Sequence, residues 1–203
     1  MTMKGSKLAL LLLLLVALEI LLFTGSDAKP WLFWRRRRRR CTSGRPSSTW
    51  INDWGQDFNF KCPNSGEFIS KWQSKYKNCL GDRVYHFECK KGPIPFQNKD
   101  CSTSHTNNGF NKALNFKCPP NGVIAGVAST YSASTRDRRF EFRCCHMQGY
   151  HAHSCKYETT LNTWHAPLNY VVPNGFYMVG AFSDYSKQDR KWQFEICLVT
   201  NYG

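Results

Sequence analysis

One phrase of eight or nine residues occurs three times in this chain, beginning at Asp82, Asp137 and Asp189. Each copy reads Asp-Arg-x-aromatic-x-Phe and reaches a cysteine two or three residues later. The aspartates are 55 and 52 residues apart, and self-similarity at such a period indicates a chain built from units of about fifty residues. The six residues of the Asp-Arg pairs are Asp82, Arg83, Asp137, Arg138, Asp189 and Arg190.

The side chains of each phrase alternate in character, as they do on a β-strand with one buried face. In the first copy Arg83, Tyr85 and Phe87 share one side of the strand, and the other two copies follow the same parity. The third cysteine, Cys197, comes one residue late, which a β-bulge would explain. Residues 41–203 show no convincing 3.6-residue apolar period. We therefore predict an all-β fold: a single disulfide-rich domain of three repeats of short antiparallel strands, compatible with a pseudo-threefold arrangement.

Two segments precede this domain. Residues 1–28 have a basic start, an apolar core and small residues before a cleavage position at Ala28, which predicts a secretory signal peptide. Residues 29–40 end in six consecutive arginines. In a secreted chain such a run is a natural substrate for a proprotein convertase cutting after Arg40, which makes 29–40 a propeptide. The alternatives are a cationic arm that stays attached and a released peptide with membrane activity.

The domain 41–203 is basic and rich in cysteine. It contains nineteen Lys and Arg against twelve Asp and Glu, so it carries +7 of the +14 net charge of the whole chain. Because the chain is expected to be secreted, the expected partners of this basic domain are sulfated or uronic-acid polysaccharides and anionic cell surfaces, and not nucleic acid. All ten cysteines lie in this domain, and an even number in an oxidising compartment predicts five disulfides.

The Asp-Arg pairs are interpreted as structural, because residues kept in all three units are most simply part of the construction of each unit. The arginine would stack on an aromatic ring, and the aspartate would cap a turn or pair with the arginine. A row of lysines on the strand before the first phrase is a better binding candidate, although such rows also protect edge strands. By strand parity six cations point away from the aromatic face and form the predicted polyanion-binding site: Lys71, Lys75, Lys77, Arg139, Arg143 and Lys191.

Neither catalysis nor metal binding is indicated by the remaining residues. The motifs Gly-x-Ser-x-Gly and His-Glu-x-x-His are both missing, and cysteines committed to bridges do not act as nucleophiles. A metal could be chelated by His146, His151 and His153 with Cys155, but a polar loop is the simpler interpretation. We therefore predict no enzymatic activity, no metal site and no cofactor.

Several of these features resemble the dermatopontin family, which includes invertebrate haemagglutinins and amebocyte aggregation factors. They are the three phrases, the adjacent cysteines Cys144 and Cys145, and a Phe-x-Cys-Pro turn that opens two units at Phe60 and Phe116. The resemblance covers residues 50–197. It implies a secreted, disulfide-bonded, mostly β protein of the extracellular matrix that binds acidic polysaccharides and proteoglycans, supports cell adhesion and has no catalytic role.

The resemblance also implies a disulfide pattern. Carried over onto the matching cysteines, the family's bridges are Cys62–Cys89, Cys101–Cys144, Cys118–Cys145 and Cys155–Cys197. Cys41 and Cys79 remain. We infer a fifth bridge between them that would tie the N-terminal arm to the first unit, the alternative being an intermolecular link through Cys41.

Secretion, positive charge and the resemblance together predict an extracellular-matrix or adhesion protein. Its expected partners are glycosaminoglycans or proteoglycans, matrix proteins and cell surfaces, without a membrane span and with a homo-oligomer as one option. One alternative is an agglutinating lectin of invertebrate innate defence, which needs several sugar sites per particle. Another is a matrix protein of a mineralised tissue.

Overall fold

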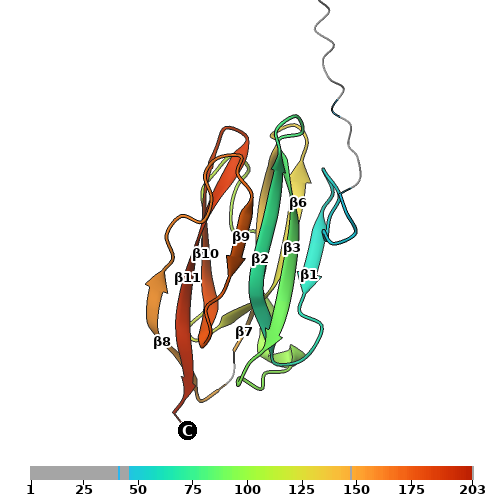
Figure 1. The fold of residues 1–203 in the computed structure, drawn as a ribbon. Coiled ribbons are helices and arrows are strands. Elements are labelled where there is room, and N and C mark those ends of the chain that lie inside the picture. Colours follow the sequence, from blue (N-terminus) through green and yellow to red (C-terminus); the bar gives the residue numbers. More distant parts are fainter. Residues whose placement is uncertain (1–40, 42–45, 147, 203) are drawn as a thin grey trace, which may run out of the picture. The chain divides into compact units, whose positions relative to one another are not determined.

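A computed structural model describes Cys41, residues 46–146 and residues 148–202 (Figure 1). The expected signal peptide, the arginine run and the processing positions Ala28 and Arg40 lie outside the described residues. The described part contains eleven β-strands and one short 3-10 helix, which confirms the all-β class. Within it, no helix has the length and apolar character that crossing a membrane requires.

The strands form three antiparallel sheets with the orders β1-β6-β7-β4, β5-β10-β11-β8 and β3-β2-β9. The elements are β1 Phe58–Lys61, β2 Glu67–Lys77, β3 Asp82–Lys91, η1 Asn98–Asp100, β4 Cys101–Thr103, β5 Leu114–Lys117, β6 Val123–Ser132, β7 Asp137–Cys145, β8 Tyr150–Tyr157, β9 Leu168–Val171, β10 Phe176–Ser186 and β11 Asp189–Asn201. Each repeated phrase thus begins the second strand of a long hairpin, at β3, β7 and β11.

Each sheet combines one such hairpin with a four-residue strand from another part of the chain. Strand β1 pairs with β6, β5 pairs with β10, and β9 returns to pair with β2. The register is the same in each case, with a hairpin serine opposite an apolar residue of the short strand: Ser129–Phe58, Ser183–Leu114 and Ser74–Leu168. Because every short strand pairs with a distant hairpin, no sheet is completed by consecutive strands alone.

The three hairpin turns lie at the same end of their sheets (Figure 1). The last residue of each turn has a left-handed backbone: φ is +62° at Gly81, +52° at Arg136 and +59° at Gln188. A Cβ added at Gly81 would lie 3.0 Å from both Cβ and Cδ of Arg136. A side chain at position 81 would therefore crowd the Arg136 side chain where the turns converge, and glycine also takes the left-handed conformation at no steric cost.

The aromatic residues of the phrases meet in the core between the sheets. The Trp192 ring lies edge to face against Phe140, with the centroids 5.0 Å apart, and 4.9 Å from Trp72 of β2. Tyr85 packs edge to face against Phe140 at 6.0 Å. All four side chains are fully buried, so the largest apolar surfaces of the three hairpins are buried against one another.

The adjacent cysteines of β7 point to opposite faces of their sheet. Cys144 has the parity of the phenylalanines in its phrase and lies in the larger apolar cluster, bonded to Cys118. Cys145 lies in a second, smaller cluster and is bonded to Cys101, its register partner on β4. The implied pairs Cys101–Cys144 and Cys118–Cys145 are therefore wrong. The two partners are exchanged because successive side chains of a strand alternate between faces.

The other three bridges join the cysteines that we expect: Cys41–Cys79, Cys62–Cys89 and Cys155–Cys197. The first holds the N-terminal arm within its own chain. Cys197 lies in the smaller cluster opposite Tyr177, as Cys145 lies opposite Val123, so its late position is that of Cys145 and does not come from a bulge in β11. Ile196 takes the place in the larger cluster that Cys144 has in the second phrase.

Candidate functional site

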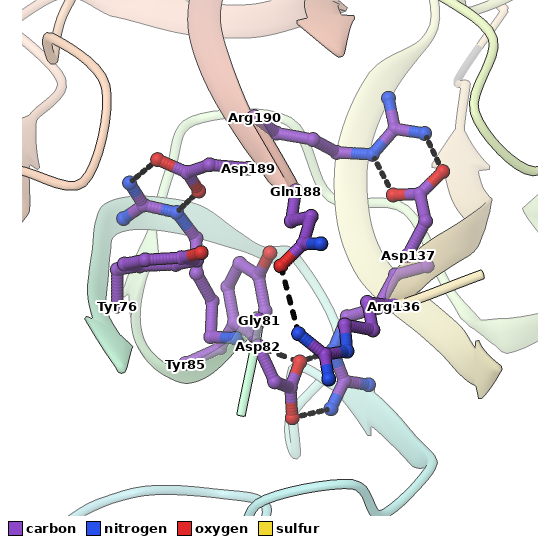
Figure 2. Close-up of a pocket in the computed structure, with 11 residues that line it drawn as sticks. Tyr76, Gly81, Asp82, Tyr85, Arg136, Asp137, Gln188, Asp189 and Arg190 are labelled. Atoms are coloured by element: carbon purple, nitrogen blue, oxygen red, sulfur yellow. Dashed lines mark hydrogen bonds and ion pairs between the residues drawn. The ribbon is translucent and has the colours of Figure 1, made fainter. Parts of the chain in front are cut away.

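The three Asp-Arg pairs form one closed ring of buried ion pairs (Figure 2). Every arginine bonds the aspartate of a different phrase, through two parallel hydrogen bonds with N···O distances of 2.5–2.9 Å. The pairs are Arg83–Asp189, Arg138–Asp82 and Arg190–Asp137. All six side chains are at most 3% exposed, so the ring ties the three hairpins together inside the protein.

Further hydrogen bonds stabilise the buried charges. Each aspartate accepts a backbone N–H from the loop that precedes the short strand of its own unit: Gly55 to Asp82, Asn111 to Asp137 and His165 to Asp189, at 2.6–2.7 Å. Arg83 also donates to the Ser74 hydroxyl and to the carbonyl of Ala166. These bonds offset part of the cost of burying the ions, which is several kcal/mol for each, although Nη1 of Arg138 and Nη1 of Arg190 have no partner.

Three buried asparagines, Asn52, Asn108 and Asn162, hold the strands that carry the ring. The Oδ1 of Asn162 accepts a hydrogen bond from the backbone N–H of Trp192, and its Nδ2 donates to the backbone carbonyl of Arg190, both at 3.0 Å. The other two asparagines make the same bonds in their units. Sequence reasoning missed them, although each opens an Asn-x-aromatic triplet 27 to 30 residues before the aspartate of its phrase.

The pocket that the ring residues line together with Arg136 and Gln188 is small. It amounts to about 20 Å³, enough for roughly one water molecule. At the turn end, the exposed Arg136 donates from Nη1 to Oε1 of Gln188 over the ring (Figure 2). A charge-neutral ring with so little free space offers no binding site for a sugar.

The six cations predicted to bind polyanions belong to three different sheets and make different contacts. Lys71 pairs with Glu88 at 2.7 Å, and that hydrogen bond is the main reason why the pKa of Glu88 is lowered. Arg143 donates to the carbonyl and side-chain oxygens of Asn98. Neither cation is therefore fully available to an external anion.

Of the other four cations, three lie over aromatic rings and one is exposed on its strand. Three of them stand over the aromatic residue of an Asn-x-aromatic triplet: Lys77 over Trp54 at 5.4 Å, Arg139 over Phe110 at 4.0 Å and Lys191 over Trp164 at 4.8 Å. Lys75 on β2 is exposed. These four residues all line grooves on the outer faces of the sheets.

The three grooves differ in charge. A groove of about 410 Å³ places Arg139 with Asp57 and Glu141, and one of about 260 Å³ places Lys191 with Asp184. The third, of about 420 Å³, is lined by two lysines and no carboxylate. Its lining residues are Pro46, Ser47, Trp50, Trp54, Lys75, Tyr76, Lys77 and Val84, and we call it the arm groove.

Metal ligands are not assembled at the histidines considered above. Among the described residues, the side chains close enough to share an ion are Cys155, Glu195 and Cys197, and their two sulfurs form a disulfide. His151 and His153 instead pack against the ring of Tyr202. This geometry provides no thiolate for a metal.

Comparison with known proteins gives a consistent result. The dermatopontin family model matches residues 47–201. Dermatopontin from Biomphalaria glabrata is 35% identical over 73% of this chain and 99% of its own length. A hemagglutinin/amebocyte aggregation factor from Limulus polyphemus is 28% identical, covering 76% and 90%, and dermatopontin from Mus musculus is 29% identical, covering 75% and 78%. No solved structure gives a significant match. This chain therefore belongs to the dermatopontin family, a family of non-catalytic matrix proteins.

Proposed function

We propose that this protein is a secreted matrix or adhesion protein that binds acidic polysaccharides and, through them, cell surfaces. The observation that carries the proposal is the positive charge of residues 41–203. The ring contains three arginines and three aspartates and is therefore neutral. The net charge of +7 comes entirely from residues outside the ring. Such a surface attracts polyanions over about a Debye length, ~8 Å at physiological salt.

Heparin-agarose chromatography tests this proposal directly. The secreted protein is expected to bind at physiological ionic strength and to elute with added salt, because the attraction is electrostatic. Unsubstituted agarose is the control. Passage through heparin-agarose without retention would contradict the function.

Agglutination is the second candidate. It is favoured by the similarity to the Limulus polyphemus hemagglutinin/amebocyte aggregation factor and by the presence of three separate grooves on one chain. Several weak sites on one particle can cross-link cells. Agglutination of erythrocytes that a neutral monosaccharide inhibits would favour the lectin, whereas inhibition by salt alone would favour the polyanion-binding protein.

We also infer that the three units are related by an approximate threefold axis through the ring. Equivalent strand pairing, equivalent serines and cyclic ion pairs support this relation. For the N-terminal segments, we propose removal of residues 1–28 and cleavage after Arg40. Mass spectrometry of the secreted N-terminus tests both cleavages.

A further inference from the structure

The arm groove lies between the N-terminal arm and the β2–β3 hairpin. The arm is held in place by the Cys41–Cys79 disulfide and by a 2.8 Å hydrogen bond from the Ile51 N–H to the Tyr85 carbonyl. The buried Asn52 adds a bond to the same strand. Because these constraints come from covalent and buried polar contacts, the groove is formed before any ligand binds.

Three positions of this groove are chemically special to the first unit. The units can be aligned on their buried asparagine and on their hairpin serine. The three positions are two residues before the asparagine and one and three residues after the serine, and in the other units they hold small or acidic residues. Trp50 corresponds to Thr106 and Thr160, Lys75 to Thr130 and Asp184, and Lys77 to Ser132 and Ser186. The fold is built in the other two units without them, so folding does not explain a tryptophan and two lysines here.

These side chains have complementary chemistry. Trp50 and Trp54 are half-buried and offer flat apolar surface, and Lys77 stands over the Trp54 ring with its ammonium 5.4 Å from the ring centre. A pyranose ring has an apolar C–H face that packs on indole, and a sulfate or carboxylate substituent accepts hydrogen bonds from lysine. The volume of about 420 Å³ is within the range of small-ligand pockets.

We propose that the arm groove is a subsite for one sulfated or carboxylated sugar residue within an acidic polysaccharide. This inference rests on the polyanion-binding function proposed above and assigns it to one place. Trp50 and Trp54 receive the sugar ring, and Lys75 and Lys77 bind its anionic group. The grooves beside Arg139 and Lys191 are not part of this subsite, because their carboxylates repel the same group.

The test is calorimetric titration of the secreted protein with a heparin-derived tetrasaccharide. The variants take the residues of the second unit: Lys75→Thr with Lys77→Ser, and Trp50→Thr. Each is expected to weaken the tetrasaccharide affinity about tenfold, the loss that one charge-assisted hydrogen bond or one aromatic contact represents. Lys75→Thr alone, at an exposed position, supplies a variant whose folding is not at risk.

Two matched controls isolate the groove. Lys71→Gln removes a cation from the same strand that is already paired with Glu88, and Lys191→Gln removes the cation of the groove that contains Asp184. Both are expected to change the affinity less than twofold. If they weaken binding as much as the groove variants, the subsite is wrong and diffuse polyanion binding remains. If the unaltered protein binds no tetrasaccharide and passes through heparin-agarose, the proposed function itself fails.

Discussion

Arg138 and Asp82 lie 56 residues apart in the chain and form a bidentate ion pair whose side chains are 3% and 1% exposed. The same relation joins the other two pairs, and the three together close a ring across all three hairpins. Each hairpin turn is therefore held by a residue of another hairpin. This arrangement predicts that the domain loses its structure cooperatively rather than unit by unit.

Breaking one pair of the ring is expected to be costly. Arg138→Met leaves the Asp82 carboxylate buried without its charge partner, which should lower the free energy of unfolding by about 3–5 kcal/mol. Guanidinium denaturation with the disulfides intact measures this loss. Adding Asp82→Asn should restore part of it, because no unpaired charge then remains buried. Arg136→Met, at an exposed arginine of the neighbouring turn, is the control, and an equal loss in both variants would contradict the role of the ring.

Removing the side chain of a buried asparagine is expected to destabilise the domain as much as removing that of an ordinary core residue. Asn162→Ala leaves the backbone N–H of Trp192 and the backbone carbonyl of Arg190 without their partner. This should lower the free energy of unfolding by about 1–3 kcal/mol for each group. Urea denaturation compares this variant with Asn169→Ala, which removes an exposed amide bonded to Gln73. Equal midpoints for the two variants would show that the buried amide does not hold the strand.

The pairing of the adjacent cysteines can be counted as free thiols. Replacing Cys118 and Cys144 together by serine removes one bridge and should leave no free thiol. Replacing Cys118 and Cys145 instead should leave Cys101 and Cys144 unpaired on opposite faces of the sheet. An Ellman assay should then count two thiols per denatured chain. The reverse result would restore the pairing implied by the family resemblance.

Buried tyrosines predict how the protein responds to alkali. Burial raises the pKa of both Tyr85 and Tyr170 above the ordinary value of 10.0. Since the folded state keeps these phenols protonated, their contribution to stability is complete below about pH 10 and is lost as the pH rises further. Absorbance at 295 nm should show that these two phenols ionise only with unfolding. In Tyr85→Phe the late step should lose the absorbance of one phenol, and an unchanged step would contradict the assignment.

Local patterning was enough to establish much of this fold. Alternation within the phrase at Arg83, Tyr85 and Phe87 predicted strands, and recurrence of the phrase predicted that these strands carry the core aromatics. Both follow from the two-residue period of a β-strand, which depends on covalent geometry and not on distant contacts. The same parity already separates Cys144 from Cys145, so their exchanged pairing could have been derived from the residues.

The remaining features depend on which distant residues meet. The sequence contains three aspartates and three arginines in identical settings, and nothing local specifies that Arg83 binds Asp189 and not its own neighbour. That choice follows from the convergence of three hairpin turns. Likewise, Lys71 and Lys75 have the same parity on one strand, but β3 brings Glu88 to Lys71 and the N-terminal arm brings Trp50 to Lys75. Pairing and exposure are through-space properties, so they became visible only when the sheets were assembled.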